Sequence, residues 1–187
     1  MTFLPDKYKV PENPSQYMRL EEGKNIIRIL SSAIIGWEYW TEDKEGNRKP
    51  IRVKTLDEVP EEVRKTKDPR ERAKHFWAFT IYNLNLEEVQ ILEITQKTIM
   101  RLVKSLVDDE TWGDPKNYNI TINKEKTGSR DMDVEYSVMP QPKKELDKGI
   151  LEYYEAMNVS LEALFEGKDP FNVDEGEKLA EEVAEKI

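Results

Sequence analysis

The sequence predicts a mainly β domain with a few helices, and two observations support this fold class. Several short segments are rich in Ile, Val, Tyr, Phe and Trp, and residues typical of turns separate them. Between them, residues 95–110 place Ile99, Leu102, Val103 and Leu106 at the spacing of an amphipathic helix. A chain of 187 residues is long enough to bury one hydrophobic core and to carry appendages around it.

The first half of the chain predicts an irregular segment, several strands and an insertion. Residues 1–20, with three prolines, are predicted to form an irregular N-terminal arm. Residues 23–40 predict one long strand or two strands, with a bend or bulge at Gly36. A short basic strand follows at residues 49–54. Residues 55–74 contain six acidic and six basic residues and two prolines, which predicts a partly helical surface insertion.

The second half predicts four more strands around the helix. "HFWAFTIYN" (75–83) and "EVQILEIT" (88–95) predict an antiparallel pair that precedes the helix. "NYNITINKE" (117–125) and "DVEYSVMP" (133–140) alternate apolar and polar residues and predict two strands after it. One helix between the third and fourth principal strands is the connectivity expected of an OB-fold, a five-stranded Greek-key barrel.

Charge is unevenly distributed along the chain. The net charge of the chain is -9. Residues 150–187 contain 11 Asp and Glu and only 3 Lys and Arg, a net charge of -8, so residues 1–149 carry a net charge of only -1. Such asymmetry predicts an acidic tail attached to a working domain. We therefore expect four parts: an N-terminal arm (1–20), an OB-fold domain (21–142, with a helical insertion at about 55–74), short C-terminal helices (143–168) and an acidic tail (169–187).

Composition argues against several classes of function. The chain has no Cys and a single His, His75, so a disulfide framework, a thiolate metal site and a multi-histidine zinc site are excluded, and we expect no cofactor. Three adjacent carboxylates at Asp108–Glu110 could suggest a two-metal nuclease, but adjacent side chains at a helix end point in different directions. We expect a protein that is not an enzyme. No apolar run approaches the ~20 residues of a membrane span, and the first residues lack a signal-peptide core, so no membrane partner is expected.

The stretch "KHFWAFTIYN" (74–83) is unusual because alternation places aromatic rings on both faces of the strand. A half-buried strand needs only one apolar face. We expect one face to fill the core and the other to contact bases, with either Trp77 and Phe79 or Phe76 and Tyr82 facing outward according to register. Together with the rings near the end of residues 23–40, the candidate stacking residues are Trp37, Tyr39, Trp40, Phe76, Trp77 and Phe79.

Basic residues lie between the two aromatic segments. Proteins that bind single strands combine cations, which follow the phosphates, with flat rings, on which unpaired bases stack. Trp40, beside the basic loop, is the preferred stacking residue. The candidate phosphate-binding residues are Arg48, Lys49, Arg52, Lys54 and Lys74.

Four stretches resemble the single-stranded DNA-binding proteins encoded by tailed bacteriophages: "YMRLEEGKNIIRILSSAIIGWEYW", "KHFWAFTIYN", "VQILEITQKTI" and "WGDPKNYNITINKEKTG". The resemblance covers about residues 15–142. It implies an OB-fold, sequence-tolerant binding of single-stranded DNA, and a role in phage DNA replication, recombination and repair in the cytoplasm of an infected bacterial host. The zinc site of some phage single-strand binders cannot form here because the chain has no Cys. Two alternatives stay open: an OB-fold module for protein interaction, and a strand-annealing recombination protein.

The acidic end predicts a second binding role. From Asp169 onward it carries seven acidic and two basic residues, and three apolar residues recur every fourth position. We expect this tail to recruit replication or recombination proteins and to compete with DNA for the basic groove. The candidate partner-binding residues are Asp169, Phe171, Asp174, Glu175, Leu179, Val183 and Ile187.

Overall fold

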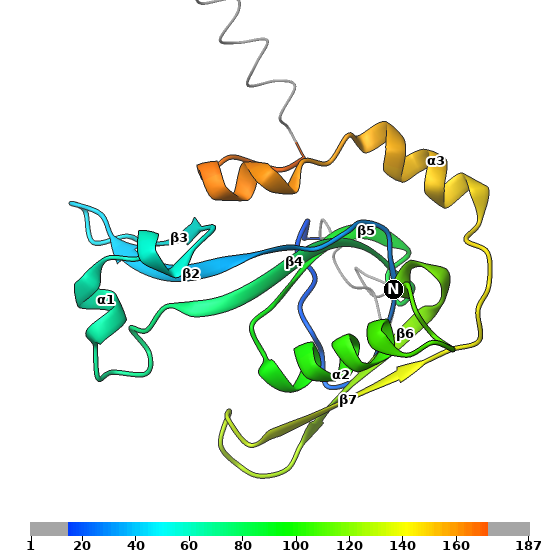
Figure 1. The fold of residues 1–187 in the computed structure, drawn as a ribbon, viewed down its shortest axis with the longest axis horizontal. Coiled ribbons are helices and arrows are strands. Elements are labelled where there is room, and N and C mark those ends of the chain that lie inside the picture. The colour runs from blue at the N-terminus through cyan, green and yellow to red at the C-terminus, as the bar shows by residue number, and fades with distance from the viewer. Residues whose placement is uncertain (1–14, 172–187) are drawn as a thin grey trace, which may run out of the picture.

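A seven-stranded, antiparallel, open sheet dominates the computed structural model, which describes residues 15–171 (Figure 1). The strands are β1 (Gly23–Ile29), β2 (Ile34–Glu42), β3 (Arg48–Val53), β4 (Lys74–Asn83), β5 (Glu88–Ile94), β6 (Asn119–Lys126) and β7 (Val134–Pro140). The helices are α1 (Glu61–Lys65), α2 (Lys97–Asp108) and α3 (Lys148–Met157), with 3₁₀ turns η1 (Leu56–Glu58), η2 (Pro115–Asn117) and η3 (Leu161–Glu166). The prediction of a mainly β protein with helices is confirmed.

Strand β4 is the centre of the sheet. Its first half pairs with β2 and its second half pairs with β1 along the same edge, while β5 pairs along the opposite edge. Strand β1 also pairs with β6, and β6 pairs with β7. Residues 23–40, predicted as one strand or two, therefore form two strands, interrupted at residues 30–33, that pair one after the other with the same edge of β4.

The sheet does not close into the predicted five-stranded barrel. Among the described residues, no pairing joins β5 to β7. Instead, residues 16–18 run parallel to β5 along its free edge: the Met18 N–H donates to the Ile91 carbonyl at 2.9 Å, and the Ile91 N–H donates to the Gln16 carbonyl at 2.9 Å. Part of the predicted irregular arm therefore acts as a short edge strand, and covering an edge in this way satisfies backbone groups that would otherwise be unpaired.

Two separate hydrophobic clusters bury the two faces of β4. On the inner face, Phe79 and Ile81 pack with side chains of β1, β5 and β6 and with Ile99, Met100 and Val103 of α2. On the outer face, Phe76 and Ala78 pack with Ile91 and with Leu164 of η3. The aromatic residues of "KHFWAFTIYN" lie on both faces because each face has its own core.

Strands β2 and β3 extend beyond the rest of the sheet together with α1, at the left of Figure 1. We call residues 34–73 the β2–β3 extension. Gly36 lies where the extension meets the outer cluster, and a Cβ there would lie 2.4 Å from the Val53 carbonyl oxygen and 2.9 Å from the Phe165 ring. The glycine predicted to mark a bend thus permits a close approach of backbone and ring that no other residue allows.

The C-terminal part of the described chain crosses back over the sheet. Helix α3 begins at Lys148, where the Asp147 side chain accepts a hydrogen bond from the Gly149 N–H at 2.8 Å, and none of its residues is buried. The segment around η3 then lies on the outer face of β3 and β4 (Figure 1). Among residues 15–171, no helix is long and apolar enough to cross a membrane.

Candidate nucleic-acid interface

Trp40 is the most exposed of the predicted stacking residues. Its residue surface is 44% exposed, although a large apolar ring is normally buried. It lies on the outer face of β2 directly opposite Pro50 of β3. Cross-strand neighbours of this kind have Cβ atoms about 4.5–5.5 Å apart, so Trp40 and Pro50 form one continuous surface.

Trp37 and Tyr39 alternate with Trp40 and lie on the inner face of the extension. Both are half-buried. The Trp37 ring packs against the His75 ring at a centroid distance of 5.1 Å and an interplanar angle of 54°. Both rings keep part of their surface exposed for a base, but one side of the Trp37 ring is already in contact with His75.

Three predicted stacking residues belong to the hydrophobic clusters instead. Phe76 is completely buried and Phe79 is 3% exposed, so neither ring can reach a base, and these two predictions are wrong. Trp77 is half-buried and packs against the inner cluster. The physical reason is that both faces of β4 are covered by residues far apart in sequence, which alternation does not reveal: η3 covers Phe76 on the outer face, and α2 belongs to the inner cluster of Phe79 and Trp77.

Arg52 is also not a free phosphate-binding residue. Its guanidinium lies between two carboxylates, with Nη2 3.0 Å from Glu38 Oε2 and 2.8 Å from Glu93 Oε2. All three side chains are less than one-fifth exposed. Burying charges is costly unless they are paired, so this triad fixes Arg52 in place, and its prediction as a phosphate contact is corrected.

The electrostatics of the triad are unusual because two carboxylates share one cation. Burial, together with the hydrogen bond to Glu93 and the charge of Glu93, raises the pKa of Glu38 to about 8, and Arg52 and Lys74 only partly oppose this. Near neutral pH the raised pKa therefore favours the protonated form of the Glu38 carboxyl.

The remaining predicted cations lie on the surface. Arg48 forms an exposed ion pair with Glu71 at 3.2 Å. Lys54 pairs with Glu162 at 2.9 Å and lies 5.3 Å from the centre of the Phe165 ring. Exposed ion pairs contribute little, about 0–1 kcal/mol, so these cations can exchange their partners for a phosphate. Lys49 and Lys74 are exposed on the two strands that flank β2, opposite Thr41 and Glu38 respectively.

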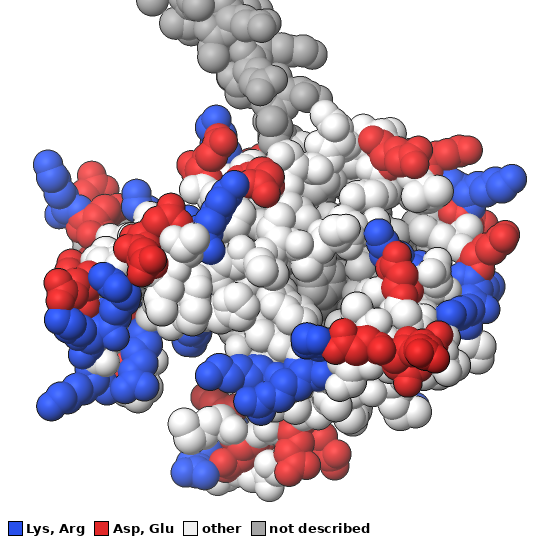
Figure 2. Space-filling model, viewed as in Figure 1, with Lys and Arg blue, Asp and Glu red and all other residues white. Residues whose placement is uncertain are grey.

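The extension is more basic than the chain as a whole. The extension, residues 34–73, contains ten Lys and Arg and ten Asp and Glu, whereas the complete chain has a net charge of -9. Figure 2 shows these charged side chains mixed over the extension, at the left, with several Lys and Arg at its outer end. The exposed Trp40 ring therefore lies in a part of the chain that has no net charge, within an acidic protein.

The predicted acidic tail lies only partly within the described residues. Phe171 packs against the outer hydrophobic cluster, and the Asp169 side chain accepts a hydrogen bond from the Phe171 N–H at 2.9 Å. These two residues therefore belong to the folded body rather than to a free tail. Asp174, Glu175, Leu179, Val183 and Ile187 lie outside the described residues.

The three carboxylates at Asp108–Glu110 do not form a group. Asp108 is ion-paired with Lys104, and Asp109 accepts hydrogen bonds from the backbone of Thr111 and Trp112. Among residues 15–171, no cluster of three or more metal-ligating side chains was found.

Sequence reasoning missed Tyr17 and the turn at residues 164–169, which lie beside β3 on the outer face. Tyr17 falls in a segment predicted to be irregular, and no periodicity distinguishes it. The only signal is its apolar neighbour Met18, which is buried in the inner cluster and fixes the segment to the sheet.

Comparisons with known proteins identify no relative. No protein-family model, no curated protein and no solved structure matches the chain.

Proposed function

We propose that this protein binds single-stranded DNA with little sequence preference, along the outer surface of the β2–β3 extension, and that it serves phage DNA replication, recombination and repair in the cytoplasm of an infected host. It needs no cofactor and no catalytic residue for this role. The proposal extends the resemblance of its sequence to phage single-strand binders.

The observation that carries the proposal is the position of Trp40. A single exposed apolar ring is common at a protein surface, so the neighbours of Trp40 give its exposure a meaning. Here the ring lies beside a strand that carries Arg48 and Lys49, in a region without net negative charge. A flat ring beside cations matches the two parts of a nucleotide, the base and the phosphate.

The strand pairing supports an OB-type architecture for this role. Strands β1 and β2 together pair with β4, β4 pairs with β5, and β1 pairs with β6, which pairs with β7. Helix α2 lies between β5 and β6 in the chain. This connectivity resembles that of a partly open OB barrel in which β1 and β2 together would form the first strand. The β2–β3 extension would then be an enlarged first loop, one of the loops with which OB-folds bind oligonucleotides.

A second candidate, a protein-interaction module, is favoured by helix α3. None of its residues is buried, and Leu151 and Tyr153 are 42% and 55% exposed. This surface is distant in sequence from the extension, so the two functions are compatible.

The Trp40→Ala variant tests the proposed interface. We expect it to lose about 1–3 kcal/mol of binding free energy for oligo-dT, because one base loses its stacking partner. Trp40→Phe, which keeps a flat ring, should recover most of this loss. The measurement is a fluorescence titration with a labelled oligonucleotide at constant salt.

Tyr153→Ala is the matched control, since it removes an exposed ring from α3. It should leave the affinity unchanged. An equal affinity of Trp40→Ala and the unmodified protein would exclude this surface as the interface.

A further inference from the structure

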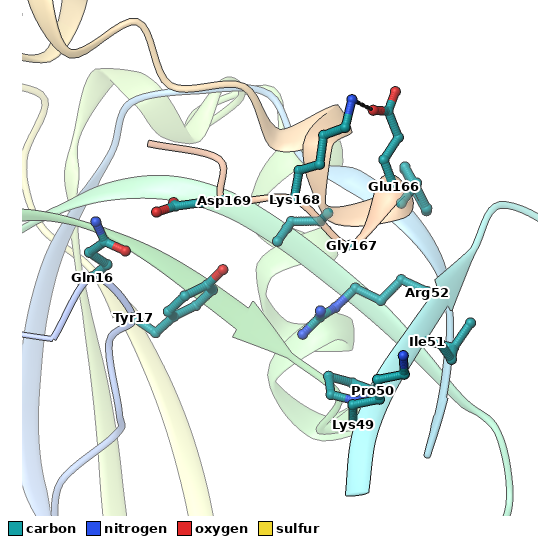
Figure 3. Close-up of a pocket in the computed structure, with 12 residues that line it drawn as sticks. Gln16, Tyr17, Lys49, Pro50, Ile51, Arg52, Glu166, Gly167, Lys168 and Asp169 are labelled. Atoms are coloured by element: carbon teal, nitrogen blue, oxygen red, sulfur yellow. Dashed lines mark ion pairs between the residues drawn. The ribbon is translucent and has the colours of Figure 1, made fainter. Parts of the chain in front are cut away.

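A cavity of about 560 Å³ opens on the outer face next to β3 (Figure 3). Residues 16–17 form one wall, residues 49–52 of β3 form another, and the turn at residues 164–169 closes the third side. Its volume falls within the roughly 300–1,000 Å³ of ligand-binding pockets. The cavity is thus built from three segments that only the fold brings together.

Tyr17 offers an aromatic ring to this cavity. The residue is 36% exposed, and Figure 3 shows its ring facing Arg52 across the cavity. Its backbone is held by the neighbouring hydrogen bonds to β5, and its own N–H donates to the Ser15 hydroxyl at 3.2 Å. A ring on a fixed backbone provides a pre-organised stacking surface, which reduces the entropy lost on binding.

The charges around the cavity favour a base inside it and a phosphate outside it. The Arg52 charge is already compensated by Glu38 and Glu93, and the carboxylate of Asp169 forms part of the wall. A carboxylate accepts hydrogen bonds from base N–H groups and repels phosphates.

The charged residues on both sides of the cavity affect the pKa of the Tyr17 hydroxyl. Burial raises its pKa above the ordinary value, and the charge of Asp169 adds to this while that of Arg52 opposes it. The side chain therefore stays neutral near neutral pH, which suits stacking against an uncharged base.

The cavity is continuous with the surface that carries Trp40. Pro50 lines the cavity and is the direct cross-strand neighbour of Trp40. Lys49 also lines the cavity, next to Pro50, and is exposed. A strand whose base stacks on Trp40 therefore has a path over Pro50 into the cavity, with a cation beside that path.

We infer that this cavity holds one nucleotide of the bound strand, with its base stacked on Tyr17 and its phosphate outside, near Lys49. The inference rests on the proposed function and adds a second, enclosed base site to the open one at Trp40.

The test compares Tyr17→Ala with Tyr17→Phe in titrations against oligo-dT and against an abasic oligonucleotide of equal length and charge. Tyr17→Ala should weaken oligo-dT binding by roughly 5–100-fold, the equivalent of one lost stack. Tyr17→Phe keeps the ring and should bind as the unmodified protein does. On the abasic oligonucleotide, all three proteins should bind equally, because no base is present to stack.

Tyr17→Leu is the control for a loss of packing, since it keeps an apolar side chain of similar bulk but has no flat ring. It should bind oligo-dT as weakly as Tyr17→Ala does. If Trp40→Ala weakens binding but Tyr17→Ala and Tyr17→Leu do not, the cavity is not a base site, although the proposed function stands. If the unmodified protein does not bind oligo-dT at all, the proposed function fails first and this inference fails with it.

Discussion

Phe76→Ala is expected to destabilise the protein by about 3–5 kcal/mol, the usual cost of removing a fully buried phenylalanine ring. Phe76 has no exposed surface, and its ring packs with Ala78, Ile91 and Leu164, 6.1 Å from the Phe165 ring. Removing it leaves a cavity between the sheet and η3. Thermal or urea unfolding of the two proteins measures the difference.

Phe76→Leu provides the control that separates stability from binding. It fills most of the cavity, so we expect a smaller loss of stability and an unchanged affinity for oligo-dT. A stable Phe76→Leu protein that binds oligo-dT as weakly as Trp40→Ala would contradict this expectation. The Phe76 ring would then contact DNA, which requires the outer cluster to open.

Arg52→Met is expected to cost about 3–5 kcal/mol at pH 8, because it leaves two buried carboxylates without their shared cation. The loss should be smaller at pH 5, where the carboxylates can take up protons. Arg52 joins Glu38 to Glu93 beneath η3, at distances of 3.0 and 2.8 Å. The measurement is the free energy of unfolding by urea at the two pH values.

The unmodified protein should show a pH dependence of stability with the same sign. The folded-state pKa of Glu38, about 8, lies above its ordinary value of 4.5, so the folded protein holds a proton that the unfolded chain releases. Stability therefore falls as the pH rises from about 4.5 to about 8, by ~1.4 kcal/mol for each pKa unit of the shift.

Glu38→Gln is the matched variant, since its amide resembles the protonated carboxyl. It should flatten the pH dependence over this range and should partly rescue Arg52→Met. A stability profile of the unmodified protein that rises between pH 5 and 8 would contradict the raised pKa of Glu38.

The strands could be predicted from the sequence because alternation and turn residues are local signals. The segments around Ile27, Phe79, Ile91, Ile120 and Val138 all form strands, and the one long amphipathic segment forms α2. The open edge could not be predicted. It depends on the pairing of Tyr17 with Ile91, two residues far apart in the chain, and no pattern in residues 1–20 marks it.

The candidate site was predicted in part, for a similar reason. Alternation correctly shows that β4 has two aromatic faces, but it cannot show what covers them, and Leu164 covers Phe76. Charge alone likewise cannot separate Lys49, which is exposed, from Arg52, which is locked between two carboxylates. Trp40 was predicted as the preferred ring because it lies beside the basic loop, and its exposure fits that role.

The most direct test of the central claim is a titration of the full chain with labelled oligo-dT and with a duplex of the same length, at two salt concentrations. We predict that the single strand binds much more tightly than the duplex, because only unpaired bases can stack on Trp40. We also predict that the affinity falls as salt rises, with a logarithmic slope of roughly -0.7 for each phosphate contacted. Equal affinity for single strand and duplex at the same salt would contradict the account.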